Sequence, residues 1–149
     1  MELVLIVIAV VVLAILSKQI GKGSFERCEY WAKKPLSEIE QIAYWRIKEA
    51  CGEDKVLLSQ VAFSSFIKTK GRDKAARSGY ARARQKVADF VICNKDFSIF
   101  AIVEIDDSTH SAEKDRKRDE ITESAGIVTY RLEAKALPSV AELKEAMKL

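Results

Sequence analysis

Two nearly continuous apolar runs separated by a short polar turn are the feature that most constrains the fold of this chain. Residues 87–106 read "VADFVICNKDFSIFAIVEID", in which "DFVIC" and "SIFAIV" flank the turn "NKD" at 94–96. Asn and Asp favour turns because their side chains bond to nearby backbone groups, so this stretch predicts a β-hairpin. Strands this apolar are typically covered on both faces. We therefore expect the hairpin at the centre of a sheet that is flanked by helices.

The patterns on either side of the hairpin supply those helices and further strands. Residues 35–52 predict a helix with Ser37 as N-cap, Glu40 three residues later and Gly52 as the stop. The other expected elements are strands at 55–63 and 127–132 and helices at 111–126 and 138–149. A chain of 149 residues is long enough for one such domain and too short for two. The prediction is an α/β domain over residues 35–149.

The first segment of the chain is strongly apolar. Residues 3–16 carry no charge, and the apolar character continues to Ile20 if Lys18 extends its ammonium group to the membrane surface. Bilayer-spanning helices need roughly 17–25 residues. We predict an N-terminal transmembrane helix, with residues 3–20 in contact with the membrane, an anchor at 1–20 and a tether at 21–34.

The charges around this segment predict its orientation. Basic residues follow it at Lys18, Lys22, Arg27, Lys33 and Lys34. The positive-inside rule then places the globular domain in the cytoplasm, on the inner face of the plasma membrane. A secretory signal is the weaker alternative, because its first residues are normally basic and this chain begins with Met-Glu. A buried core element is the other alternative.

The cysteines indicate a reducing environment. Cys28, Cys51 and Cys93 are odd in number, far apart and without C-x-x-C spacing. This pattern argues against a disulfide framework and against a zinc knuckle. We expect three reduced thiols.

A basic stretch at residues 68–86 is the candidate nucleic-acid contact. It carries eight basic residues against one acid, with Gly71, Gly79 and Tyr80 interspersed, and reads as a flexible or partly helical loop. The predicted phosphate-binding residues are Lys68, Lys70, Arg72, Lys74, Arg77, Arg82, Arg84 and Lys86. The alternative is a solvated loop whose charges offset acids elsewhere.

Two acids within the apolar strands of the hairpin, Asp89 and Glu104, predict a metal site. A carboxylate in such a strand is costly to bury unless it is paired or binds a cation. Carboxylate oxygens are ligands for several divalent cations, so these residues predict a metal without identifying it. Asp106 and His110 follow at the end of the second strand. Their structural roles would be to end the strand and to cap the next helix.

The order of these residues resembles the PD-(D/E)XK nuclease superfamily. The resemblance rests on "ADF" with Asp89, "VEIDDSTH" with Glu104 and His110, and "KRDEITESAGIVTYRL", and it covers roughly residues 35–132. Within the superfamily the chain is most similar to the very-short-patch-repair-like branch and to domain-of-unknown-function family 2726. The resemblance implies a restriction-endonuclease-like central mixed sheet and a magnesium (or manganese) ion held by Asp89 and Glu104.

The resemblance also implies roles for Glu40 and for the helix after the hairpin. Glu40 matches an acid on the family's first helix, although capping alone would explain it. Asp115, Arg118 and Asp119 match an arginine-aspartate pair, although their spacing also suits an intrahelical ion pair. The family usually has a lysine where this chain has Asp106. Asp106 could then bind metal or polarise a water, and His110 would serve as base or ligand.

Two functions follow from these residues. The first is a membrane-anchored, magnesium-dependent nuclease that hydrolyses phosphodiester bonds in DNA or RNA. The alternative is a catalytically inactive nucleic-acid-binding or scaffold module at the inner membrane surface, where the basic loop would also contact anionic lipid.

Overall fold

The structure is a computed structural model that describes residues 1, 6–8, 10–13, 28–106 and 112–149, without the side chains of 112–115 and 117. The chain divides into two compact units, Met1–Lys33 and Lys34–Leu149.

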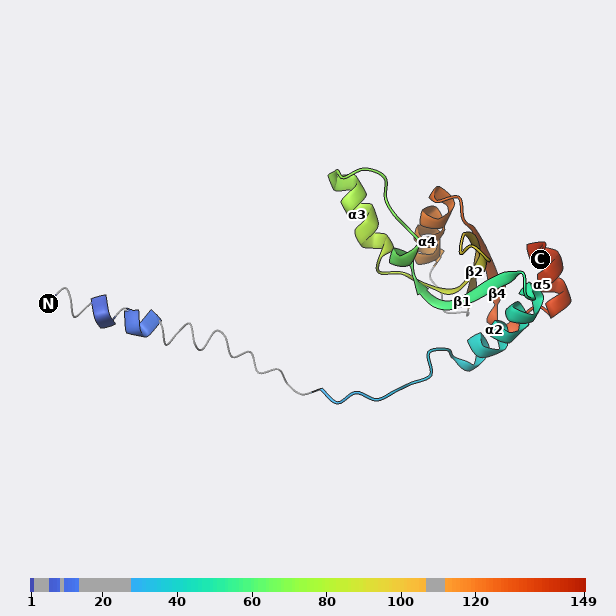
Figure 1. Cartoon of the computed structure of the whole chain (residues 1–149), viewed down its shortest axis with the longest axis horizontal. Coiled ribbons are helices and arrows are strands. Elements are labelled where there is room, and N and C mark those ends of the chain that lie inside the picture. The colour runs from blue at the N-terminus through green and yellow to red at the C-terminus, as the bar shows by residue number, and fades with distance from the viewer. Residues whose placement is uncertain (2–5, 9, 14–27, 107–111) are drawn as a thin grey trace. The chain divides into compact units, whose positions relative to one another are not determined.

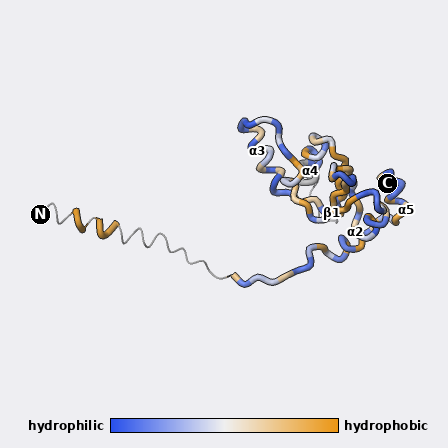
Figure 2. Tube along the Cα trace, in the orientation of Figure 1, coloured by the Kyte–Doolittle hydropathy of each residue, from blue (hydrophilic) through white to orange (hydrophobic). Residues whose placement is uncertain are grey.

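The first unit contains the predicted anchor. Residues 6–8 and 10–13 are helical, apolar and exposed (Figure 2). Among the described residues, no helix has the length and apolar character needed to cross a membrane. The predicted transmembrane helix therefore lacks support in this part of the chain, and 2–5, 9 and 14–20 lie outside the described residues.

The second unit is built on a four-stranded mixed sheet. The strands are β1 (Lys55–Ala62), β2 (Val87–Asn94), β3 (Ile99–Asp106) and β4 (Val128–Glu133). They lie side by side in sequence order; β2 is antiparallel to both of its neighbours, β1 and β3, whereas β4 is parallel to β3. The predicted hairpin is confirmed, and the Asp96 side chain accepts hydrogen bonds from Ser98 in its turn.

Two helices cover one face of the sheet, α2 (Glu38–Cys51) and α5 (Val140–Met147) (Figure 1). Each begins with a capping box, Ser37 with Glu40 and Ser139 with Glu142. A capping box satisfies two backbone N–H groups that the first turn leaves unpaired. The helices bury Ile47 and Leu143 against Phe90 and the strands around it. The helix predicted at the start of the domain is thus confirmed.

The opposite face is covered by a 3-10 turn (η1, Phe63–Ser65) and by α3 (Lys74–Ala83) and α4 (Ala112–Ser124) (Figure 1). The helix α4 connects β3 to the parallel strand β4, and Thr129 of β4 donates a hydrogen bond to Thr122 of α4 at 3.1 Å. A second 3-10 turn, η2 (Ala134–Ala136), leads towards α5. The mixed sheet between helices agrees with the predicted architecture.

The basic stretch is more ordered than expected. Residues 74–83 form the helix α3, with Asp73 as N-cap accepting a hydrogen bond from Ala76 N at 2.8 Å. Ala83 is buried against the sheet. The helix forms despite Gly79 because it is capped and packed against the sheet, and tertiary packing of this kind supplies most helix stability in proteins.

All three cysteines lie in the described part of the chain. They are free thiols, with Cys28 exposed and Cys51 and Cys93 buried. The prediction that they form no disulfide is confirmed.

Candidate functional site

Asp89 and Glu104 lie next to each other on the central strands. Phe90 pairs with Val103 in the antiparallel register, which places Asp89 opposite Glu104 one position further along. Side chains alternate between the two faces of a strand, so both carboxyl groups lie on the α4 side of the sheet with Ile102. Glu104 is only 1% exposed and Asp89 is partly buried. The two predicted metal ligands are therefore brought together.

The two carboxyl groups interact with each other, and each has a further partner. Ile105 N donates to Asp89 Oδ2 at 2.9 Å. The Arg118 guanidinium, from α4, donates to Glu104 Oε2 and forms an ion pair with it. Glu104 Oε1 is buried and accepts no hydrogen bond from the part of the chain that the structure describes. Within the described residues, this buried carboxylate oxygen therefore has unused acceptor capacity.

Burial dominates the electrostatics of this pair. It raises the pKa of Glu104 to about 8, the Arg118 charge opposes the rise, and the Asp89 carboxyl beside it adds to it. Burial also raises the pKa of Asp89. The hydrogen bond from the Ile105 amide lowers this pKa, and the negative charge of Glu40 raises it. Two acids that share one site hold a proton more tightly than isolated acids do. The pair favours either a bound proton or a bound cation near neutral pH.

Glu40 reaches this site from α2. Its Oε2 accepts a hydrogen bond from Ser37 N at 2.6 Å, and its Oε1 accepts one from Gln60 Nε2 at 2.9 Å. Gln60 lies in β1 between two residues paired with β2, opposite Asp89, with a φ of 53°. Glu40 therefore caps its helix and bonds the strand residue opposite Asp89, and its charge raises the pKa of Asp89. Gln60 was not predicted, because no glycine or turn pattern marks it.

A second arginine extends the cluster to β4. Arg131 pairs with Glu104 in the parallel register. It donates to Asp106 at 3.1 Å and to Asp119 at 2.7 Å. The side chain of Asp106 is thus held by an arginine. Arg131 was not predicted as a member of the site. A signal was present, because Arg131 alternates with apolar residues of its strand and lies on the same face as Thr129.

The predicted arginine-aspartate pair on α4 has a different arrangement from the expected one. Arg118 binds Glu104 of β3, and Asp119 binds Arg131 of β4. Both residues therefore connect the helix to the sheet. The side chain of Asp115 lies outside the described part of the chain.

The remaining predicted member of the site is not described by the structure. His110 lies in the gap at 107–111. Among the side chains that the structure describes, no three His, Cys, Asp or Glu residues stand together as metal ligands. The described candidates for holding magnesium are the predicted pair, Asp89 and Glu104. The role of His110 stays a prediction.

Comparison with known proteins identifies the family of this domain. A family profile described as "Protein of unknown function (DUF2726)" matches residues 32–149. The chain belongs to the DUF2726 family. Searches of curated proteins and of solved structures return no match. The acid cluster and both arginines lie within the DUF2726 domain.

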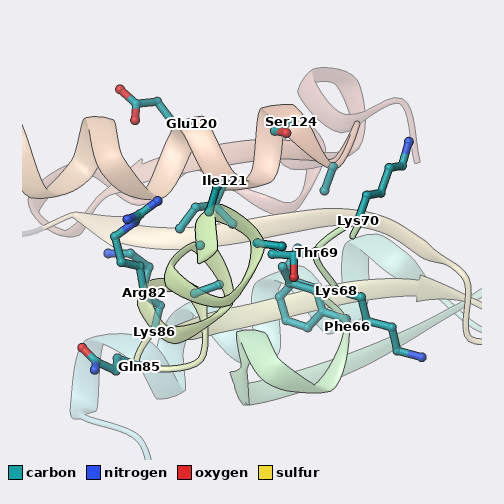
Figure 3. A pocket seen from close by; sticks show the side chains of 16 residues that line it. Phe66, Lys68, Thr69, Lys70, Arg82, Gln85, Lys86, Glu120, Ile121 and Ser124 are labelled. Carbon is teal, nitrogen blue, oxygen red and sulfur yellow. The ribbon is translucent and has the colours of Figure 1, made fainter. Parts of the chain in front are cut away.

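The basic residues of the DUF2726 domain are divided between two environments. A groove between α3 and α4 is lined by four of the eight predicted phosphate-binding residues, Lys68, Lys70, Arg82 and Lys86 (Figure 3). The other four, Arg72, Lys74, Arg77 and Arg84, do not line it. Figure 2 shows the hydrophilic character of α3 and the loop before it. Half of the predicted set therefore gathers at one groove.

Proposed function

We propose that this protein is a magnesium-dependent nuclease of the PD-(D/E)XK type that hydrolyses phosphodiester bonds of nucleic acid. The observation that carries the proposal is Glu104, a buried acid in an apolar strand whose Oε1 accepts no hydrogen bond from the described residues. Asp89, beside it, adds a second carboxyl group on the same face of the sheet. Magnesium is often held by one or two carboxylates together with substrate phosphates, so this pair fits the ion.

The metal and the protein have separate roles in this proposal. Asp89 and Glu104 would hold the ion, which when bound polarises a phosphoryl oxygen and acidifies a coordinated water. The Ile105 amide orients the Asp89 carboxyl group through a hydrogen bond, and the negative charge of Glu40 raises the pKa of Asp89. His110 is proposed as the base that accepts the proton of the attacking water.

The departure from the usual lysine has a candidate explanation in the arginines. Asp106 occupies the position of that lysine and is held by Arg131. Arg118 provides a second cation at Glu104. We propose that these guanidinium groups supply the positive charge that a lysine offers to a phosphate, since arginine binds phosphate oxygens in a bidentate manner.

The same arginines favour a second candidate function. Glu104 and Asp106 are both ion-paired within the protein itself. A carboxylate that already has a cation partner needs no metal for its burial. A catalytically inactive nucleic-acid-binding or scaffold module is therefore the alternative proposal. In either case the apolar residues 3–20 are proposed to anchor the protein at the inner membrane, with the domain in the cytoplasm.

Metal binding and cleavage, measured on the same samples, test the nuclease proposal. Titration calorimetry of the full chain with MgCl₂ and MnCl₂ is paired with nicking of a supercoiled plasmid and cleavage of a labelled RNA. We expect saturable binding and metal-dependent cleavage, both lost in Asp89→Asn and Glu104→Gln. Asp54→Asn is the matched control, because Asp54 is an exposed acid paired with Lys95.

The two candidate functions predict different results. Retention of both activities in Asp54→Asn, with loss in the two site variants, supports the nuclease. A folded wild-type protein that binds neither metal and cleaves neither substrate would favour the inactive module.

A further inference from the structure

The groove between α3 and α4 has features that the acid cluster does not explain. It has a volume of about 1240 Å³ and lies on the α4 side of the sheet. Its apolar lining includes Ile67 and Ala83, which are buried, and Ile121 of α4. Figure 3 shows Ile121 facing the groove from α4, across from the residues of the loop and α3. The groove is thus apolar at its base.

Its rim is basic. Figure 3 shows Arg82 and Lys86 at one side of the groove and Lys68 and Lys70 at the other. Glu120 is the acid in the lining, and its carboxylate lies 3.8 Å from Arg116, which compensates its charge. The rim therefore attracts an anion that is long enough to contact both sides.

An aromatic ring lies within this basic groove. Phe66 lines it and is half-buried. Its ring centroid lies 5.2 Å from that of Phe63, which is fully buried. Packing against Phe63 limits the movement of the Phe66 ring, so its remaining exposed surface is held ready for contact.

We propose that this groove binds a single strand of nucleic acid, with a base stacked on Phe66 and phosphates on the rim cations. Cationic grooves with aromatic platforms bind single strands because every base has a face that can stack. A duplex keeps its bases stacked on one another and offers such a ring mainly phosphate and sugar.

The position of the groove relates it to the acid cluster. Lys86 precedes Asp89 by three residues, which spans roughly 10 Å of extended chain. The helix α4 contributes Arg118 to the acid cluster and Ile121 to the groove. A strand in the groove would thus extend towards Asp89. The inference names the substrate class of the proposed nuclease and rests on that proposal, whereas the binding itself uses neither Asp89 nor Glu104.

Fluorescence anisotropy of the full chain tests the inference. The probes are labelled 12-nucleotide oligothymidine and oligouridine and a 12-base-pair DNA duplex, in EDTA to prevent cleavage. We expect the single strands to bind at least about five-fold more tightly than the duplex. Phe66→Leu should weaken single-strand binding about five-fold or more, as loss of a stacking contact does. Lys70→Gln should reduce the salt dependence of binding, since one phosphate contact is lost.

Gly79 offers a variant that blocks the groove without touching its core. A Cβ added there meets Thr69 Cγ2 at 3.4 Å, an ordinary contact, so Gly79→Ala should fold and bind normally. Gly79→Leu should fill the groove and abolish binding without lowering the melting temperature, since leucine favours a helix more than glycine does. Lys144→Gln, on α5 at the opposite face of the sheet, is the charge control and should bind as wild type does.

The outcomes separate this inference from the proposed function. Glu104→Gln should lose cleavage and keep single-strand binding, so that failure of the nuclease leaves the groove result intact. Equal affinity for duplex and single strand, unchanged by Phe66→Leu and Gly79→Leu, would overturn the inference. Vesicles of phosphatidylserine are the second probe. If Gly79→Leu loses binding to these vesicles but keeps binding to oligothymidine, the inference is also overturned.

Discussion

Arg118 and Glu104 form an ion pair between the crossover helix α4 and the central strand β3. The guanidinium contacts Oε2, whereas the buried Oε1 accepts no hydrogen bond from the described residues. Arg118 therefore balances the charge of Glu104 without filling its acceptor capacity. This difference between the two oxygens makes Glu104 sensitive to protons and to cations.

Stability should fall as pH rises through the range in which Glu104 titrates. The folded-state pKa is raised from 4.5 to about 8, so folded protein keeps a proton that unfolded chain releases. The stabilisation is fully present below about pH 4.5 and is lost as pH approaches 8, with a limiting slope of about 1.4 kcal/mol per pH unit. Urea denaturation between pH 5 and 8 measures it. Glu104→Gln should remove this component, and an unaltered slope in that variant would assign it to other groups.

Removal of Arg118 should destabilise the protein more at high pH than at low pH. Arg118→Met leaves a buried carboxylate without its cation, which costs about 3–5 kcal/mol when the acid is ionised. At pH 5 Glu104 is protonated and needs no partner, so the loss should be much smaller. The control is Arg116→Met on the same helix, whose pair with Glu120 is exposed. An equal loss at both pH values would contradict the prediction.

Arg131→Lys should weaken the attachment of α4 to β4. The hydrogen bonds from Arg131 to Asp106 and Asp119 need the planar fork of arginine. Each charge-assisted bond contributes about 1.5–3 kcal/mol at most, and partial exposure reduces this, so we expect a loss of about 1–2 kcal/mol. A double-mutant cycle with Asp119→Asn measures the coupling. Additive effects of the two changes would show that the pair contributes nothing.

Gln60→Gly should be more stable than Gln60→Ala. Gln60 has a φ of 53°, a conformation that costs residues with a Cβ about 1–2 kcal/mol. Both variants lose the hydrogen bond to Glu40, but only glycine relieves the backbone strain. Thermal denaturation of the two variants gives the comparison directly. If alanine proves equal to glycine, the strain at this position is negligible.

The sequence predicts the local parts of this fold better than its long-range contacts. The hairpin and the first helix are encoded by neighbouring residues, namely the turn at 94–96 and the Ser37–Glu40 box, and both are found. The helix α3 was only partly expected, because glycines lower its intrinsic propensity and its packing on the sheet is a tertiary effect. The pairing of Asp89 with Glu104 followed from the hairpin register.

The arginines show where prediction from the sequence ends. Arg118 has helix neighbours at favourable spacing, which suggested a local ion pair, but its partner is 14 residues away on a strand. That contact depends on how the crossover helix lies on the sheet. The strained backbone of Gln60 likewise has no local signature, since its neighbours Ser59 and Val61 read as ordinary strand residues.

The backbone at Gln60 also affects how the sheet meets other molecules. The strand β1 is at one edge of the sheet, where unpaired N–H and C=O groups can accept a strand from another chain. A residue with positive φ interrupts the regular spacing of those groups between Ser59 and Val61. A continuous foreign strand cannot align along the whole edge. The conformation that brings Gln60 to Glu40 therefore also protects the protein against edge-to-edge aggregation.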